Sequence, residues 1–199
     1  MERDSNKLSK RRERTIIEEW NSIKTPSAPN IRKVTIGQNT ALLILDIQNI
    51  NCTADNRPRC VQSLPKIQRL LTQARNAKLP IIYSLTRNGE LSDIRKEVKP
   101  LTGEYIVKSS VDKFYGTNLE RLLKTHHIDT VILVGTSAHG AVLHTATGAA
   151  IRGYNLIVPL DCISAEDPYA EQYTAWHLAN SPGTRKRTIL TITKLIQFH

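Results

Sequence analysis

Thr130-Val-Ile-Leu-Val-Gly-Thr-Ser-Ala-His-Gly-Ala-Val-Leu-His-Thr-Ala-Thr-Gly-Ala-Ala-Ile-Arg-Gly153 is the stretch that decides the fold. Residues 131–134 are an apolar run typical of a buried strand, and residues 141–151 form a nearly continuous apolar helix after a turn of small residues. In a parallel sheet, such a junction points the first backbone N–H groups of the helix into the crevice at the carboxyl edge. The amides of Gly140, Ala141 and Val142 therefore mark a candidate site for an anion or an oxyanion.

From residue 40 onward the chain repeats this alternation of strands and helices. The helices are predicted to start near Ser63, with Pro65 in the first turn, at a capping box of Thr117 and Glu120, and at Asp167. The strands are predicted at residues 41–45, 80–85, 105–108, 131–134, 156–160 and 188–192. Right-handed crossovers between such strands give a mostly parallel sheet that is covered on both faces. The predicted fold is a three-layer α/β/α sandwich.

Length and composition limit the class of protein. The 199 residues, 40% of them hydrophobic, suit one domain with a full core, and we expect no membrane span. The three cysteines, Cys52, Cys60 and Cys162, are an odd number without metal-type spacing, and no signal peptide opens the chain. We therefore expect no disulfide framework, a reducing compartment and a cytoplasmic protein.

The net charge of +10 raises the question of nucleic acid. Residues 1–33 hold nine basic and five acidic groups, a balance of +4, so the remaining +6 is spread thinly, and we do not expect a nucleic-acid partner. The dense basic cluster is interpreted as the solvated face of a terminal helix and consists of Lys7, Lys10, Arg11, Arg12 and Arg14.

An apolar stripe with helical spacing follows the basic cluster, and we expect it to dock on the domain or on a second subunit. It consists of Ile16, Ile17, Trp20 and Ile23. Residues 26–30 are predicted to be a linker, which divides the chain into residues 1–30 and a domain of residues 31–199.

Several polar residues fall where a predicted parallel strand gives way to its loop. These ends share one edge of the sheet, so Asp46 and Lys108 are predicted to face the helix start at Ala141. The alternatives are structural, because a carboxylate often caps a loop and a lysine often lies on the surface. The pattern by itself leaves both open.

Spaced blocks of sequence resemble the isochorismatase-like hydrolases, also called the cysteine hydrolase superfamily. The blocks are Thr-Ala-Leu-Leu-Ile-Leu-Asp-Ile-Gln-Asn at residues 40–49, residues 106–108 followed by Phe-Tyr-Gly-Thr-Asn-Leu at 114–119, Val-Gly at 134–135, Thr-Ala at 145–146 and Arg-Gly-Tyr at 152–154. The resemblance runs from about residue 40 to about residue 192. It implies a six-stranded parallel sheet, an oligomeric enzyme, and a triad in which Asp46 is the acid and Lys108 the lysine.

The third member of that triad, a cysteine nucleophile, is replaced. The resemblance places Ala141 at its position, and a methyl group cannot attack a carbonyl. The nicotinamidase branch also needs a histidine and aspartate metal cluster after the first strand, and residues 49–63 contain no histidine. We therefore expect neither cysteine-dependent amide hydrolysis nor a metal or other cofactor.

One branch of the family, the isochorismatases of siderophore and phenazine pathways, carries a small residue at this position and an Ala-His pair like Ala138-His139. Its reaction, hydrolysis of a vinyl ether, needs a positioned acid and no nucleophile. The resemblance implies Asp46 as that acid, provided that burial outweighs the effect of a nearby lysine on its pKa. The predicted residues around a small carboxylated substrate are Arg87, Phe114, Thr136, His139 and Gly140.

The sequence suggests three other interpretations. A cysteine-type amidohydrolase disabled at Ala141, naturally or by engineering, and a catalytically silent oligomer that binds a small anion both stay open. A nicotinamide site does not, because the near miss to the dinucleotide fingerprint at residues 135–140 opens the fourth crossover rather than the first.

Overall fold

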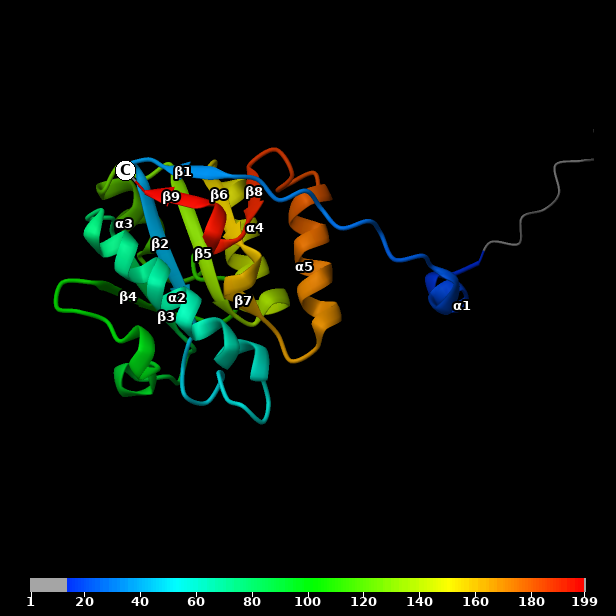
Figure 1. Cartoon of the computed structure of the whole chain (residues 1–199), viewed down its shortest axis with the longest axis horizontal. Coiled ribbons are helices and arrows are strands. Elements are labelled where there is room, and N and C mark those ends of the chain that lie inside the picture. Colours follow the sequence, from blue (N-terminus) through cyan, green and yellow to red (C-terminus); the bar gives the residue numbers. More distant parts are fainter. Residues whose placement is uncertain (1–13, 199) are drawn as a thin grey trace, which may run out of the picture.

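The computed structural model describes residues 14–198, in which a parallel sheet lies between two layers of helices (Figure 1). The strand order is β4-β3-β2-β5-β6-β8, and all neighbours on this path are parallel. The strands span β2 Thr40–Leu45, β3 Ile81–Leu85, β4 Tyr105–Lys108, β5 Thr130–Thr136, β6 Asn155–Pro159 and β8 Thr188–Thr191. A short seventh strand, β7 (Ile163–Ser164), pairs with the end of β5. The predicted three-layer sandwich is confirmed.

Both faces of the sheet are covered, which explains the unbroken apolar runs in the sequence. In β2 every residue is buried, and its odd-numbered residues pack toward one layer while Leu42 and Ile44 pack toward the other. The first layer contains α3 (Leu119–Thr125), α4 (Leu143–Ile151) and α5 (Pro168–Asn180), and the second contains α2 (Pro58–Asn76). The carboxyl ends of β2, β3 and β5 are therefore held side by side by two cores.

Two of the predicted helix starts are wrong. Helix α2 begins at Pro58, five residues before Ser63, because Pro58 itself occupies the first turn and Pro65 lies within the helix. Helix α3 has no capping box: the carboxylate of Glu120 binds Lys124 and Arg152 instead. The cap of α5 is as predicted, since the side chain of Asp167 accepts from the N–H of Tyr169.

The N-terminal segment stands apart from the sandwich. A two-stranded parallel ribbon joins β1 (Val34–Ile36) to β9 (Ile196–Phe198), and the preceding residues run outward to α1 (Ile16–Glu19) and a 3₁₀ turn at Trp20–Ser22 (Figure 1). The predicted apolar stripe is 56–73% exposed, so it does not dock on its own fold as one expectation had it. The other expectation, docking on a second subunit, stays a prediction. Lys7, Lys10, Arg11 and Arg12 lie outside the described residues.

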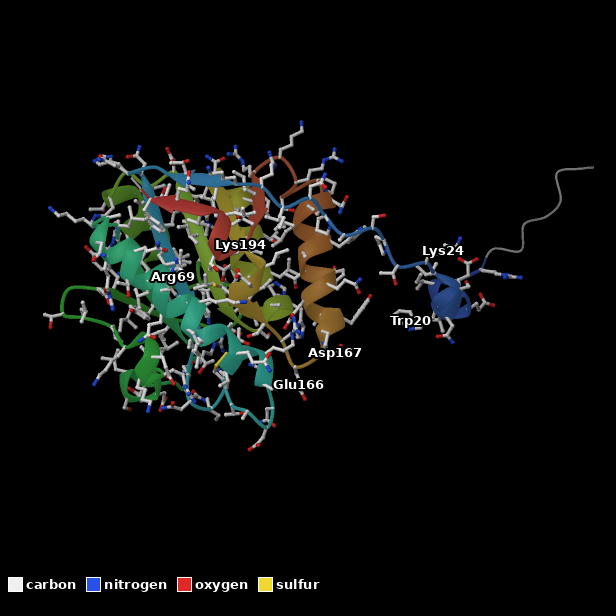
Figure 2. The ribbon with its side chains drawn as sticks, in the orientation of Figure 1. Trp20, Lys24, Arg69, Glu166, Asp167 and Lys194 are labelled. Carbon is white, nitrogen blue, oxygen red and sulfur yellow. A yellow bond between two sulfur atoms is a disulfide. The ribbon has the colours of Figure 1, made fainter. Side chains whose placement is uncertain are left out.

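A disulfide contradicts the expectation that the cysteines are unpaired. Cys52 and Cys60 form a disulfide at the start of α2, with their Cα atoms 5.3 Å apart (Figure 2). Sequence spacing alone did not reveal this pair, because the loop after β2 folds back onto the first turn of α2. The bond removes the observation on which the expectation of a reducing, cytoplasmic compartment rested. Within residues 14–198, no helix has both the length and the apolar character that a bilayer crossing requires.

Candidate functional site

Asp46 is the first residue after β2, at the centre of the sheet. Leu45, just before it, is paired with Ser84 of β3 on one side and Gly135 of β5 on the other. Asp46 has a left-handed backbone with φ of 51°, which aspartate tolerates better than most residues. The chain therefore turns sharply where the strand ends, and the carboxylate lies at the carboxyl edge between β3 and β5.

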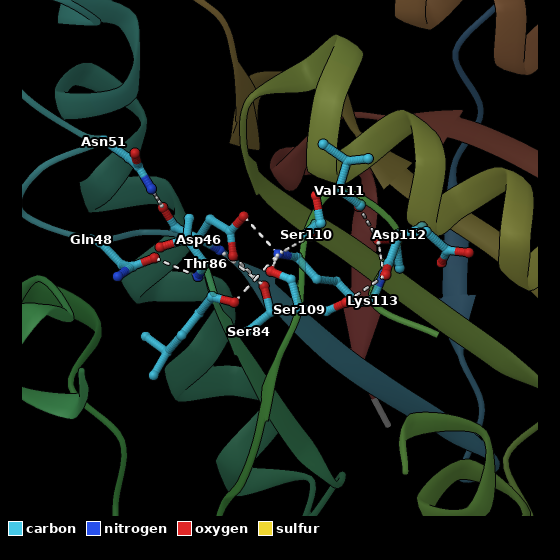
Figure 3. Close-up of polar contacts among 12 residues, drawn as sticks. Asp46, Gln48, Asn51, Ser84, Thr86, Ser109, Ser110, Val111, Asp112 and Lys113 are labelled. Carbon is cyan, nitrogen blue, oxygen red and sulfur yellow. Dashed lines mark hydrogen bonds and ion pairs between the residues drawn. The ribbon is translucent and has the colours of Figure 1, made fainter. Parts of the chain in front are cut away.

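Two groups hold the carboxylate of Asp46. The hydroxyl of Ser84 donates to Oδ1 at 2.7 Å, and the ammonium of Lys113 donates to Oδ2 at 2.8 Å (Figure 3). The side chain of Asp46 is 8% exposed and that of Lys113 is fully buried. A charge-assisted hydrogen bond of this length in a buried site fixes the orientation of the carboxyl group.

All three N–H donors of the Lys113 ammonium are used by oxygen atoms of the protein. Besides Asp46, its Nζ donates to the carbonyl of Ser110 at 2.6 Å and lies 3.3 Å and 3.5 Å from those of Ser109 and Leu85. An ammonium has three protons, so these four oxygens use them all. Lys113 therefore positions Asp46 and does not bind the carboxylate of a substrate.

The expectation that Lys108 is the lysine beside Asp46 is corrected. Lys108 ends β4, but its side chain is 42% exposed and its Nζ forms an ion pair with Glu90 at 3.0 Å. The loop after β4 instead returns Lys113 to the sheet edge. The sequence signal for this was weak: Lys113 lies in the same loop, directly before the block that begins at Phe114.

Burial has the largest effect on the pKa of Asp46. Desolvation raises the pKa of this carboxyl above its ordinary value, and the opposing pull of Lys113 and the hydrogen bond from Ser84 offset it only in part. Of the two opposing effects that the sequence left open, burial is therefore the larger. A carboxylic acid with a raised pKa is what general acid catalysis requires.

The turn after β5 brings the start of the next helix to the same edge. Gly135 has φ of 132°, and a Cβ atom there would lie 2.1 Å from the carbonyl oxygen of Leu45, so only glycine allows this approach. A π-helical turn at Ala138–Val142 follows and leads into α4. In this turn the N–H groups of Gly140 and Val142 both donate to the carbonyl of Ser137. The Gly140 amide, which we expected to donate to a ligand, is therefore already hydrogen-bonded within the protein.

Thr145 joins this helix to the loop that carries Lys113. Its hydroxyl accepts from the N–H of Lys113 at 3.2 Å and donates to the carbonyl of Val111 at 3.3 Å. Because Ala141 lies four residues before Thr145, it occupies the same helix face, one turn nearer the N-terminus. Ala141 is buried in the π-helical turn that precedes this helix.

The other predicted contact residues are not brought together. Thr136 is buried, and its hydroxyl donates to the backbone carbonyl of Ser164 at 3.1 Å. Phe114 is a core residue under the guanidinium of Arg152, which lies 4.6 Å from the ring centre. Arg87 is exposed on the loop after β3, and His139 is exposed in the groove between α4 and α5. The fold uses Phe114 for packing and Thr136 for a hydrogen bond to β7, and none of these four side chains bonds to the Asp46 carboxylate.

None of the three cysteines supplies a thiolate at this edge. Cys52 and Cys60 are bonded to each other, and Cys162 is fully buried after β6, where desolvation raises the pKa of its thiol strongly. Among residues 14–198, no three histidine, cysteine, aspartate or glutamate side chains are grouped so as to hold a metal ion.

Comparisons with known proteins bear on the domain and on the fold. The sequence profile of the isochorismatase domain matches residues 40–189. An N-carbamoylsarcosine amidase of an Arthrobacter species is 26% identical over 79% of this chain and 71% of its own length, and a secreted isochorismatase effector of Verticillium dahliae is 30% identical over 65% and 75%. Among solved structures, an isochorismatase family protein of Desulfovibrio vulgaris has a TM-score of 0.71 at 19% identity, over 79% of this chain and 96% of that one.

Proposed function

This chain belongs to the isochorismatase family, and we propose that it is a hydrolase of a small carboxylated substrate that works without a cysteine nucleophile. The observation that carries the proposal is the buried Asp46 carboxyl, held by Lys113 and Ser84 at the carboxyl edge of the sheet. In this proposal Asp46 supplies the acid, and the alanine at residue 141 supplies no nucleophile.

The reaction that such a site supports is hydrolysis of a vinyl ether. Asp46 donates its proton to the electron-rich carbon of the double bond, and the carbon attached to the ether oxygen becomes an oxocarbenium ion. Water adds to that carbon and loses a proton to the Asp46 carboxylate, and the resulting hemiketal breaks into a ketone and an alcohol. The acid is regenerated in each cycle, so no covalent enzyme intermediate is required.

The remaining groups have supporting roles in this proposal. Lys113 and Ser84 orient the carboxyl group, and the small side chain of Ala141 leaves room for the substrate or the water. Because Lys113 is occupied by protein oxygens, the substrate carboxylate is recognised by other groups at the sheet edge.

A second candidate is an amidohydrolase that lacks its nucleophile. It is favoured by the amidase activity in the name of the Arthrobacter relative, together with an alanine at residue 141. In that case the acid and lysine are intact but the covalent step cannot occur.

A substrate panel separates the two candidates. Isochorismate, nicotinamide, ureidoacrylate and N-carbamoylsarcosine are offered to the unchanged protein, to Asp46→Asn and to Ala141→Cys, with Asp129→Asn as the control because Asp129 is an exposed residue just before β5. We expect the unchanged protein to hydrolyse isochorismate, Asp46→Asn to lose about 10²- to 10⁴-fold in kcat/KM, and Asp129→Asn to lose nothing.

Two outcomes contradict the proposal. Amide hydrolysis that appears only in Ala141→Cys identifies a disabled amidohydrolase. Turnover of none of these compounds by any variant, with tight retention of a small anion, identifies a silent binding protein.

A further inference from the structure

The N-terminal arm, defined as residues 14–25, has apolar side chains that no other part of residues 14–198 covers. Ile16, Ile17, Trp20 and Ile23 are 56–73% exposed. The hydrogen bonds of the arm are local, between Thr15 and Glu18 and between Ser22 and Glu19, and the first from this end of the described chain to the sandwich is made by Arg32 to Leu190. A short helix with an uncovered apolar face is not stable in water by itself, so the arm needs a partner surface.

The sandwich has a matching surface on its outer helix layer, here called the aromatic face: Ile151 of α4 and Tyr169, Tyr173 and Trp176 of α5. All four are exposed, and the rings of Tyr173 and Trp176 are stacked with their centres 6.4 Å apart. The arm does not close onto this face. A groove of about 610 Å³ separates them, with Ile16, Trp20 and Ile23 on one wall and the tyrosines and Trp176 on the other.

The connection between arm and sandwich holds this groove open. Residues 23–33 contain no helix or strand, and Pro26 and Pro29 stiffen the segment in an extended form. In Figure 2 Trp20 and Lys24 lie on the arm, across an open space from the end of α5 at Asp167. Each wall carries large apolar side chains, which is a property expected of a surface that pairs with a copy of itself.

We propose that two copies of this chain exchange arms, so that each arm clasps the aromatic face of the partner and the partner's α5 fills the groove. In a two-fold arrangement each copy gives one arm and receives one, and every apolar residue of the groove becomes buried. The edges of the two surfaces are complementary in charge. Lys24 of the arm is positive, and the exposed residues Glu166 and Asp167 at the start of α5 are negative.

The available area is sufficient for a stable dimer. Eight large side chains, four on the arm and four on the aromatic face, are each 39–73% exposed. Covering them buries on the order of 800 Å² per copy, which is about the area that each partner contributes to a standard interface. The interface also adjoins the groove between α4 and α5, which shares Tyr169 and Tyr173 and includes His139.

The oligomeric state is the first test. The full chain, of 22.4 kDa, is measured by light scattering at micromolar concentration, beside Trp20→Glu and the control Leu91→Glu, whose exposed apolar residue lies on the loop after β3. We expect twice the monomer mass for the unchanged chain and for the control, and a twofold loss of mass for Trp20→Glu. A monomeric unchanged chain, or an unaltered mass of Trp20→Glu, overturns the proposal.

Cross-linking then tests the exchange itself. Chains of two different sizes, one with Trp20→Cys and the other with Tyr173→Cys, are mixed and oxidised, while Trp20→Cys with Leu91→Cys is the control pair. We expect a covalent dimer of unequal chains, at least tenfold more abundant than in the control. A bond that forms only within one chain carrying both substitutions shows that the arm folds back on its own α5, and that result also overturns the proposal.

Discussion

At the scale of single residues, Lys108 and Lys113 form a matched pair for substitution, because Lys108 is exposed and Lys113 is buried. Lys113→Met leaves the buried carboxylate of Asp46 without its ion-pair partner, which costs about 3 kcal/mol of unfolding free energy. Lys108→Met removes only an exposed pair with Glu90 and changes the unfolding free energy by less than about 0.5 kcal/mol. Urea unfolding measures both. A larger loss from Lys108→Met than from Lys113→Met would contradict the arrangement of the site.

The protonation of Asp46 gives a dependence on pH. Because burial raises the pKa of Asp46 above its ordinary value of 3.8, the acid form persists above that pH and is lost as the pH rises through the raised value. We expect kcat/KM to fall as the pH rises through the pKa of Asp46. In Lys113→Met this fall should move to higher pH, because Lys113 lowers the pKa of Asp46. The contribution of Asp46 to stability has the same sign: it is present below pH 3.8 and lost as the pH rises through the raised pKa. A rate that increases with pH over this range would mean that Asp46 acts as a base.

At the scale of the elements, the disulfide ties the loop after β2 to α2. Cys52 and Cys60 are eight residues apart, and closing so short a loop stabilises the folded state by about 2–3 kcal/mol. We expect dithiothreitol to lower the unfolding free energy by that amount and to leave a Cys52→Ser, Cys60→Ser variant unchanged. Alkylation of the denatured protein checks the bond directly, with one modified cysteine before reduction and three after. Three before reduction would show that the pair is not bonded.

The contact between α4 and the lysine loop gives a second prediction for this scale. Thr145→Val removes a buried hydroxyl that binds the backbone of both Lys113 and Val111, at a cost of about 1–2 kcal/mol. The activity falls further than the stability explains, because Lys113 is no longer held against Asp46. Thr147→Val is the control, a partly exposed position on the same helix. Equal effects of the two substitutions on kcat/KM would show that Thr145 does not position the site.

At the scale of the whole molecule, exchange of arms couples folding to association. A hundredfold rise in protein concentration stabilises a dimer and should raise its Tm by about 3–5 °C. Trp20→Ala should abolish this dependence, whereas Leu101→Ala, an exposed residue before β4, should preserve it. Calorimetry at two concentrations measures the effect. A Tm that is independent of concentration in the unchanged chain would indicate a monomer.

The sequence by itself determined the layers of the fold and one residue of the site. Fully buried parallel strands and the helices that cover them leave unbroken apolar runs, so the strands around residues 41–45 and 131–134 could be predicted without coordinates, whereas their order in the sheet was not predicted. The place of Asp46 at the sheet edge could also be predicted, because a strand end fixes where its next residue lies, but the pattern left its role open. These features depend on local periodicity, which a single chain records directly.

Only the tertiary structure decided which side chains meet. Lys113 replaces Lys108 beside Asp46 because the loop after β4 folds back on the sheet edge, and Cys52 meets Cys60 because another loop folds back on α2. Loops have no periodicity from which such a return can be predicted. The pKa of Asp46 also could not be predicted from the sequence. Desolvation and the charge of Lys113 shift it in opposite directions, and their balance depends on distances and burial. The uncovered arm shows the same division: its apolar stripe could be predicted from spacing, but its position away from the sandwich could not.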